Sequence, residues 1–127
     1  MKRKILWMIA AVLGLVLAMQ QLQASQGVDV KTAQGMVDQG ALLLDVREPA
    51  EYAAVHATNA KLMPLGQVGM RVHELDAWKD KPVAVMCRSG RRSARAVAML
   101  QEAGFKQVSN VQGGILAWEQ AGLQVVR

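Results

Sequence analysis

Short apolar segments alternate with helix-like segments along most of this chain, and this alternation constrains its fold more than any other feature. The strand-like segments are 41–46, 61–64, 83–86 and 107–111. The segments rich in helix formers, or with apolar residues at helical spacing, are 49–54, 65–78, 93–103 and 114–120. Strands that alternate with helices form βαβ units around a parallel sheet. We therefore predict an α/β fold with a mostly parallel, twisted sheet of about five strands and helices on both faces.

The N-terminal segment has the organisation of a secretory signal peptide. A basic start at residues 2–4 is followed by an uncharged apolar run at 5–19 and a polar exit that ends at Ala24. The run is shorter than the ~20 residues of a membrane span, so we expect cleavage after Ala24, with an uncleaved anchor as the alternative. The sequence predicts a signal peptide at 1–24 and one domain at 25–127, exported to the periplasm or an equivalent space as a soluble protein.

Charge and composition argue against several function classes. The formal net charge is +5, but residues 2–4 carry three of these charges, and a domain of charge +2 without interleaved basic and aromatic residues does not indicate a nucleic-acid partner. One cysteine and two distant histidines have no metal-ligand spacing. No glycine-rich nucleotide fingerprint is present. We expect no metal, no cofactor and, after signal cleavage, no stable membrane association.

The single cysteine, Cys87, lies between a predicted strand and the helix predicted to begin at Ser93. A loop in that place faces a helix N-terminus, where unpaired N–H groups and the helix dipole favour an anion. Arg88, Arg91 and Arg92 add positive charge, and such surroundings lower a thiol pKa from about 8.5 to ~3.5–7.5. Structural cysteines of exported proteins usually occur in disulfide pairs. We predict a nucleophilic thiol, with a buried structural cysteine as the alternative.

Three blocks of the chain resemble the rhodanese-homology domain family in its single-domain exported form. They are Leu44-Asp45-Val46-Arg47-Glu48-Pro49-Ala50-Glu51-Tyr52, Cys87-Arg88-Ser89-Gly90-Arg91-Arg92-Ser93, and Gly104-Phe105 with Val108-Ser109-Asn110-Val111-Gln112-Gly113-Gly114-Ile115-Leu116-Ala117-Trp118. The resemblance covers residues 28–126, and the three blocks occur in the order and spacing of the family. It implies a rhodanese-like fold and a thiosulfate sulfurtransferase.

The resemblance also implies a role for each matching residue. Cys87 would take a sulfane sulfur from a donor such as thiosulfate, forming a persulfide, and would pass it to a thiophilic acceptor such as cyanide or a thiol, including a thiol protein. The loop N–H groups would hold the persulfide, and Arg88 and Arg91 would attract the anionic donor. The residues expected to bind substrate are Arg88, Ser89, Gly90, Arg91, Arg92 and Ser93.

The first block is expected to support the loop rather than touch the substrate. Asp45 would orient loop amides, and Arg47 and Glu51 stand at the i,i+4 spacing that favours an ion pair. Between the first two blocks the chain departs from the family pattern. It has Val55-His56-Ala57 for Gly-His-Ile, and Thr58-Asn59-Ala60 in place of the following Gly-Ala. We expect a changed turn there and a structural role for both histidines, His56 and His73.

Two other functions compete with sulfur transfer by a turnover enzyme. A cysteine phosphatase loop needs an arginine six residues after the nucleophile, but Ser93 stands there, and Met86 occupies the usual histidine position. The second is a carrier module that delivers persulfide sulfur to one protein partner and turns over small donors poorly. Turnover with thiosulfate and cyanide, compared with transfer to a protein thiol, separates the carrier from the enzyme.

Overall fold

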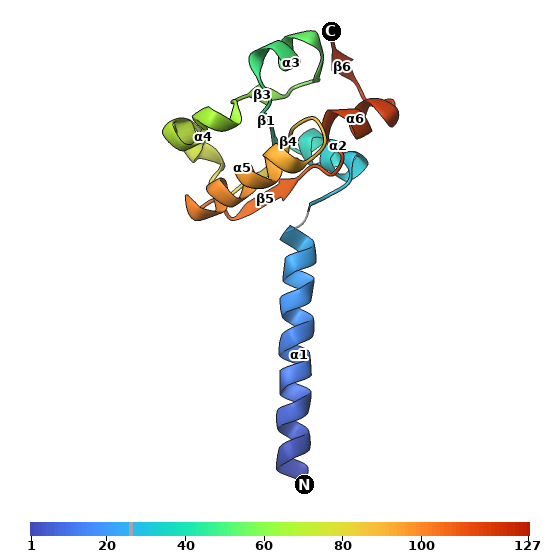
Figure 1. Ribbon diagram of the computed structural model, residues 1–127, viewed down its shortest axis with the longest axis vertical. Coiled ribbons are helices and arrows are strands. Elements are labelled where there is room, and N and C mark those ends of the chain that lie inside the picture. The colour runs from blue at the N-terminus through green and yellow to red at the C-terminus, as the bar shows by residue number, and fades with distance from the viewer. Residues whose placement is uncertain (26) are drawn as a thin grey trace.

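The computed structural model describes the backbone of residues 1–25 and 27–127 and the side chains of residues 1–17 and 27–127. Four parallel strands form its main sheet, in the order β3-β1-β4-β5 (Figure 1). These strands are β1 (Leu42–Asp45), β3 (Lys61–Leu62), β4 (Pro82–Met86) and β5 (Gln107–Asn110). The predicted parallel sheet is confirmed, with four strands rather than about five, because Val28 adds only an isolated parallel bridge to Val111.

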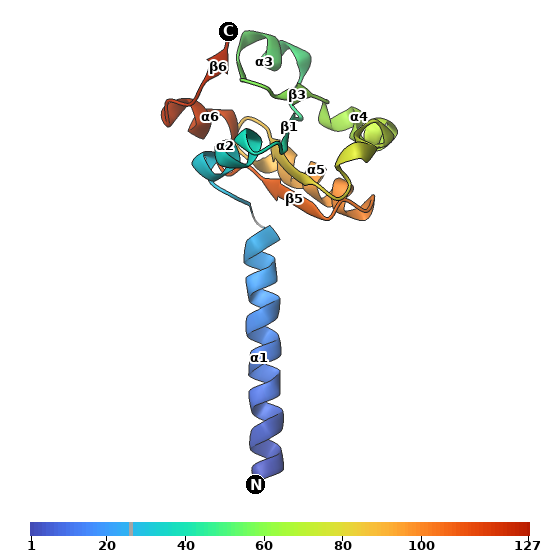
Figure 2. The ribbon, with the colours of Figure 1, turned by 180° about the vertical axis from the view of Figure 1, so that it is seen from behind.

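Helices cover both faces of this sheet, as Figures 1 and 2 show. The elements that pack on one face are α4 (Leu65–Arg71), the 3₁₀ helix η1 (Val72–Trp78) and α5 (Arg91–Glu102). Those on the other face are α2 (Val30–Asp38) and α6 (Gly114–Gln120). Successive residues of β1 alternate between the two cores, since Leu42 and Leu44 join the first and Leu43 joins the second. Burial on both faces explains why this strand is apolar throughout.

The predicted end of α5 is confirmed in its capping geometry. The N–H of Phe105 donates to the carbonyl of Leu100 at 3.0 Å, and the N–H of Gly104 donates to that of Gln101 at 3.1 Å. These are the two bonds of a Schellman motif, with Gly104 at a φ of +96°. The start of α5 differs from the prediction, because Gly90 caps the helix and the first turn begins at Arg91 instead of Ser93.

The predicted helix at 65–78 is divided into α4 and η1. Val72, Leu75 and Trp78 are three residues apart, and a 3₁₀ helix has three residues per turn, so the change of helix type places all three on one side. Leu75 is fully buried, and the other two pack against the same core. Core packing therefore explains a break that the apolar spacing alone did not reveal.

Several further elements complete the chain. Helix α3 (Pro49–Ala54) and helix α6 agree with their predicted ranges. Strands β2 (His56–Ala57) and β6 (Val125–Val126) form a small antiparallel pair that the sequence did not predict, and α2 was also missed. The N-cap Asp29, which accepts from the N–H of Thr32 at 2.7 Å, is the local signal that α2 offered.

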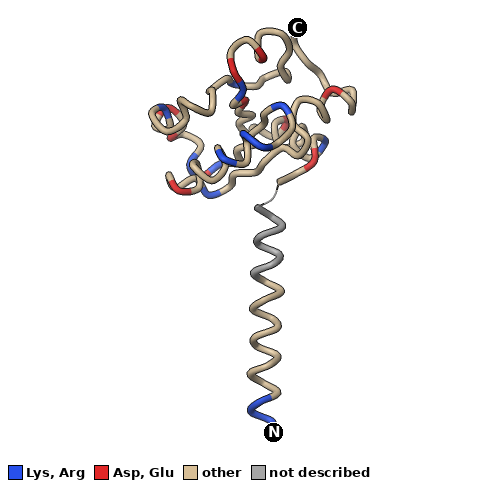
Figure 3. Tube along the Cα trace, in the orientation of Figure 1, with Lys and Arg blue, Asp and Glu red and all other residues tan. Residues whose placement is uncertain are grey.

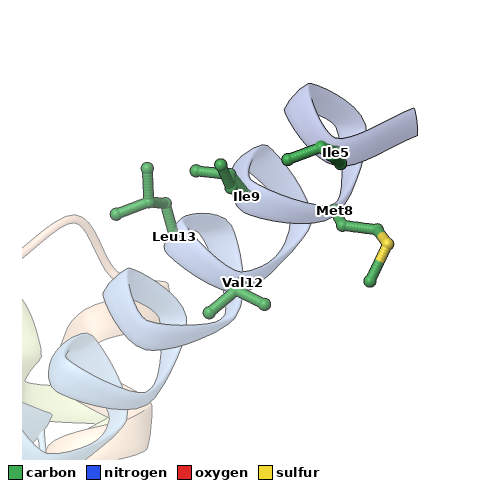
Figure 4. A pocket seen from close by; sticks show the side chains of 5 residues that line it. All are labelled: Ile5, Met8, Ile9, Val12 and Leu13. Carbon is green, nitrogen blue, oxygen red and sulfur yellow. The ribbon is translucent and has the colours of Figure 1, made fainter. Parts of the chain in front are cut away.

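The predicted signal segment forms helix α1 (Lys2–Ser25). Apolar side chains project from it into solvent over the described part, among them Ile5, Met8, Ile9, Val12 and Leu13 (Figure 4). Within the described residues, no helix combines the length and the apolar character that crossing a membrane demands.

Candidate active site

Cys87 lies directly beyond β4, at the carboxyl end of the parallel sheet, as the sequence predicts. The Gly90 N–H donates to the Cys87 Sγ at 3.1 Å, and the Ser93 hydroxyl lies 3.3 Å from the same sulfur. Gly90 adopts a φ of +116°, a conformation that glycine takes without steric cost. The loop therefore curls around the sulfur and ends in the first turn of α5.

The first turn of α6 determines which way the loop faces. The N–H groups of Ile115 and Leu116 donate to the carbonyls of Cys87 and Arg88, at 2.9 and 3.3 Å. In a trans peptide the next N–H points opposite to the carbonyl, so the bond to the Arg88 carbonyl turns the Ser89 N–H toward the sulfur. Gly114, at a φ of +54°, lets the chains approach, because a Cβ there would collide with the carbonyl oxygens of Cys87 and Arg88. Gly114 was not among the predicted site residues, and its place in the glycine pair at the start of α6 was the available signal.

The surroundings of Cys87 bear on both alternatives, a structural thiol and a reactive one. The residue is only 1% exposed, as the structural alternative requires, and burial by itself would raise the pKa of its thiol. Hydrogen bonds from the Ser93 hydroxyl and from the N–H groups of Ser93, Gly90 and Ser89 act in the opposite direction and lower that pKa below its ordinary value. A buried sulfur with several donors directed at it is suited to hold a negative charge.

Asn110, at the end of β5, joins the site although the sequence analysis did not single it out. Its Nδ2 donates to the carbonyl of Gly90 at 3.0 Å, so its Oδ1 faces the Ser93 hydroxyl, 2.5 Å away. Ser93 has one hydroxyl proton and two neighbours that accept it, Oδ1 and the Cys87 sulfur. When the thiol is neutral, the Ser93 hydroxyl donates its hydrogen bond to the Asn110 Oδ1. When the sulfur is a thiolate, the hydroxyl donates to the sulfur instead. The signal for Asn110 was its position at the carboxyl end of the strand next to β4.

Replacing Ser93 with alanine is expected to raise the pKa of Cys87, because a hydrogen bond to the charged form is lost. The pH dependence of Cys87 alkylation by iodoacetamide measures this change. Ser89→Ala is the matched control, since Ser89 acts on the sulfur through its backbone N–H. Equal alkylation profiles for Ser93→Ala and the parent protein would contradict a role for the hydroxyl.

Asp45 and Arg47 form a buried ion pair behind the loop. The Arg47 Nη2 lies 2.8 Å from the Asp45 Oδ2, and the Nε donates to both carboxylate oxygens at 3.0 and 3.1 Å. The Asp45 Oδ1 also accepts from the backbone N–H of Arg47, and Nη2 reaches the carbonyl of Val55 at 2.7 Å. These contacts link β1 to the turn after α3. Among the described residues, the backbone amide that Asp45 binds is that of Arg47, and no hydrogen bond joins Asp45 to an amide of the Cys87 loop.

The expected ion pair between Arg47 and Glu51 does not form through the Glu51 carboxylate. Arg47 is already bound to Asp45, and it touches only the backbone carbonyl of Glu51. The Glu51 carboxylate instead binds the Arg92 guanidinium of α5 in a bidentate pair, at 2.6 and 2.9 Å. Arg92 holds the pKa of Glu51 down to about 2. Among the arginines expected to bind substrate, Arg92 is thus already engaged with a carboxylate.

The Glu51–Arg92 pair predicts a modest loss of stability in acid. Because the pKa of Glu51 is lowered on folding, its contribution is present above its ordinary pKa of 4.5 and is lost as the pH falls toward about 2. Both side chains are about one third exposed, so solvent screening limits this contribution to under about 1 kcal/mol. Urea unfolding at pH 7 should show Glu51→Gln to be less stable than the parent, with the difference shrinking at pH 3. A constant difference would contradict the assignment.

The remaining loop residues lie at the surface. Arg88, Ser89 and Arg91 are exposed, and Gly90 is half-buried. Within the part of the chain that the structure describes, the arginines at 88 and 91 have no carboxylate in ion-pair contact. The loop that lowers the pKa of the Cys87 thiol therefore also carries two exposed cations.

The region between the first two sequence blocks keeps a left-handed turn without glycine. Asn59 takes a φ of +69°, and the N–H of Ala60 donates to the carbonyl of Ala57 at 3.0 Å. Asparagine tolerates this conformation better than most residues do. His56 stacks on Tyr52 with 3.8 Å between ring centroids, and its Nδ1 lies 2.8 Å from the Tyr52 carbonyl, which agrees with a structural role.

Comparison with known proteins identifies the family. The sequence profile of the Rhodanese-like domain matches residues 29–121. The chain belongs to the rhodanese-like family. A sulfurtransferase of Allochromatium vinosum is 41% identical over 85 residues, which are 67% of this chain and 78% of that protein. The thiosulfate sulfurtransferase GlpE of Vibrio cholerae is 38% identical over 99 residues, covering 77% of this chain and 92% of GlpE.

Other relatives of this rhodanese-like domain differ in length or source. The putative sulfur carrier protein YrkF of Bacillus subtilis is 38% identical over 81 residues, but these span 64% of this chain and only 43% of YrkF. Among solved structures, a rhodanese-related protein from Thermoplasma volcanium superposes with a TM-score of 0.72 and 31% identity, over 80% of this chain and 97% of that one. The fold and the family therefore agree with each other.

Proposed function

We propose that this rhodanese-like domain is a sulfurtransferase that moves a sulfane sulfur from an anionic donor such as thiosulfate to a thiophilic acceptor through a persulfide on Cys87. The observation that carries the proposal is the Cys87 sulfur, buried and held by several hydrogen-bond donors that lower its pKa. The relatives named sulfurtransferases support sulfur transfer in general.

The first step loads the enzyme. The Cys87 thiolate attacks the sulfane sulfur of thiosulfate, a new S–S bond forms, and the bond to the sulfonate sulfur breaks with its electron pair, releasing sulfite. Charge is conserved, because the thiolate and the thiosulfate dianion become a persulfide anion and a sulfite dianion. The loop N–H groups that face the sulfur then stabilise the persulfide.

The second step unloads it. Cyanide attacks the outer sulfur, thiocyanate leaves, and the electron pair of the broken S–S bond returns to Cys87 as a thiolate. No external oxidant or reductant is needed, since the sulfane sulfur carries its oxidation state from donor to acceptor. As the charge on the sulfur changes, the Ser93 hydroxyl can rotate and donate its one hydrogen bond either to the Asn110 Oδ1 or to the sulfur.

Intact mass spectrometry tests the proposal directly. Incubation with thiosulfate should add the mass of one sulfur atom to the protein, and cyanide should remove it with release of thiocyanate. Loading without turnover by cyanide, but with transfer to a protein thiol, would favour the carrier function that the similarity to YrkF supports. No mass gain with thiosulfate would contradict the enzyme that uses thiosulfate as its donor.

Arg88 and Arg91 supply a further prediction about donor binding. Replacing both with alanine is expected to raise KM for thiosulfate about tenfold, the equivalent of about 1.4 kcal/mol, because two charges that attract the dianion are lost. Added salt should produce a similar effect in the parent protein. Steady-state kinetics measure both, and an unchanged KM in the double variant would show that these side chains only face solvent.

We also propose that the protein is exported through its N-terminal segment. The basic start, the apolar run at 5–19 and the polar exit support this proposal. Cell fractionation with N-terminal sequencing should find a chain shortened to about Ser25 in the soluble exported fraction. The full-length chain in membranes would favour an uncleaved anchor, and a cytoplasmic chain would contradict export.

A further inference from the structure

Among the residues that the structure describes, three arginines on or beside the Cys87 loop have no carboxylate partner, whereas the other arginines that follow α1 do. The paired ones are Arg47 with Asp45, Arg71 with Glu74, Arg92 with Glu51, and Arg127 with Glu119. Arg88, Arg91 and Arg95 are exposed and make no ion pair with any residue that the structure describes. Positive charge is accordingly concentrated along the loop and the start of α5 (Figure 3). We call these three side chains the arginine strip.

The arginine strip is unfavourable for the helix that carries it. The first turn of α5 has no acidic residue, although the positive end of the helix dipole favours one. Arg91 and Arg95 are four residues apart, a spacing that brings like charges together on a helix surface. Helix stability therefore does not explain the strip, and an anionic partner would relieve the repulsion within it.

The size of the strip exceeds what a small donor requires. The donors at the sulfur itself come from Gly90, Ser93 and Ser89, and the proposed function assigns attraction of the small donor to Arg88 and Arg91. Arg95 lies one helical turn further, about 6 Å along the axis of α5. A ligand that uses Arg95 as well must extend from the thiol along the surface of the helix.

We propose that the arginine strip is a docking surface for an acidic protein segment that carries the acceptor thiol. The inference rests on the proposed function and names the class of acceptor. Carboxylates that flank the acceptor cysteine would pair with Arg91 and Arg95 and bring its thiolate to the loop. The Cys87 persulfide anion takes up a proton from water, and the acceptor thiolate then attacks its outer sulfur, so that a new S–S bond forms on the acceptor and the old bond breaks with its electron pair on Cys87. The acceptor leaves as a hydropersulfide and Cys87 as a thiolate, with no net oxidation or reduction.

Binding to the unloaded protein tests the docking surface without any sulfur chemistry. The probes are two dye-labelled synthetic peptides of equal length, one with glutamates and one with glutamines around a central serine, followed by fluorescence anisotropy. The glutamate peptide should bind more tightly, and this preference should vanish near 1 M salt, where the Debye length is about 3 Å. Equal affinity for the two peptides at low salt would overturn the proposal.

Charge reversal locates the surface. Arg95→Glu should weaken binding of the glutamate peptide about fivefold or more, because repulsion replaces attraction. The matched control is Lys31→Glu, an equal change of net charge at an exposed position on α2, across the sheet. An equal loss in both variants would assign the effect to net charge and contradict a local surface. Single-stranded DNA of the same charge, if bound as tightly as the glutamate peptide, would also contradict an acidic protein as the partner.

Sulfur transfer completes the test. Protein loaded with thiosulfate and then desalted should transfer sulfur faster to a cysteine peptide flanked by glutamates than to one flanked by glutamines. Arg95→Glu should remove this preference while its loading by thiosulfate and its turnover by cyanide stay unchanged. A preference that persists in Arg95→Glu would overturn the proposal. Failure of the parent protein to load would contradict the proposed function alone, since peptide binding reports on the arginine strip independently.

Discussion

A Cys87→Ser protein is expected to fold as the parent does and to gain no mass from thiosulfate. The substitution keeps a small side chain in a site that is 1% exposed and that already supplies polar contacts from Gly90 and Ser93. It removes the covalent path, because a hydroxyl is not ionised by this loop near neutral pH and its oxygen cannot hold a sulfane sulfur. The expected loss of thiosulfate:cyanide transfer is complete within the limits of detection.

Intact mass and thiocyanate release measure this loss, and circular dichroism with urea unfolding shows whether the fold is retained. The matched control is Ser89→Ala. This change removes one loop hydroxyl, but Ser89 binds the Cys87 sulfur through its backbone N–H and not through its side chain. Sulfur transfer by Cys87→Ser at a rate near that of the parent would refute the assignment of the nucleophile. Normal folding of the variant would also exclude a purely structural role for the thiol.

Replacing Asp45 with alanine is expected to destabilise the domain by about 3–5 kcal/mol, because the Arg47 guanidinium is then left buried without its counter-ion. The side chains of both residues are almost fully buried, and Arg47 is held in place by the carbonyl of Val55 as well. A typical domain has about 5–15 kcal/mol of stability in total, so this single change brings it close to unfolding. Urea unfolding at neutral pH provides the measurement.

The double variant Asp45→Ala, Arg47→Leu separates the cost of an unpaired charge from the value of the pair itself. Replacing both charges with apolar groups should recover most of the stability lost in Asp45→Ala, since no uncompensated charge remains in the core. A double variant as unstable as the single one would show that packing around Asp45, rather than the charge on Arg47, is responsible. A single variant as stable as the parent would contradict a buried ion pair altogether.

Much of the framework follows from local sequence. The apolar run of β1 predicts a strand that is buried on both faces. The proline at the start of α3 has the fixed φ of a helix, and the glycine after α5 ends that helix with a left-handed cap. The position of Cys87 also follows locally, because a strand, a tight loop and a helix are consecutive in the chain. Helix α2 was missed although its N-cap, Asp29, is followed by apolar residues at helical spacing, among them Val30, Ala33 and Val37.

The partners of the site residues are a matter of tertiary structure. Arg47 and Glu51 are well spaced for an ion pair in a helix, but Arg47 precedes α3, so the helical rule does not apply to it. Glu51 binds Arg92, 41 residues away, and Ser93 contacts Asn110, 17 residues away. Periodicity and composition describe residues that are close along the chain. They do not indicate which of several charged residues, distant in the sequence, will lie next to a given side chain in the fold.

The sequence by itself determined the class of fold and the place of Cys87 in a loop between a strand and a helix, because propensities, caps and burial patterns act between residues close in the chain. Only the tertiary structure decided which way the loop faces, where Gly114 must lie against it, and which arginines are paired. These depend on the packing of α6 and α3 against the carboxyl end of the sheet. Packing brings together groups that local interactions leave independent, and the electrostatics of the thiol follow from those contacts.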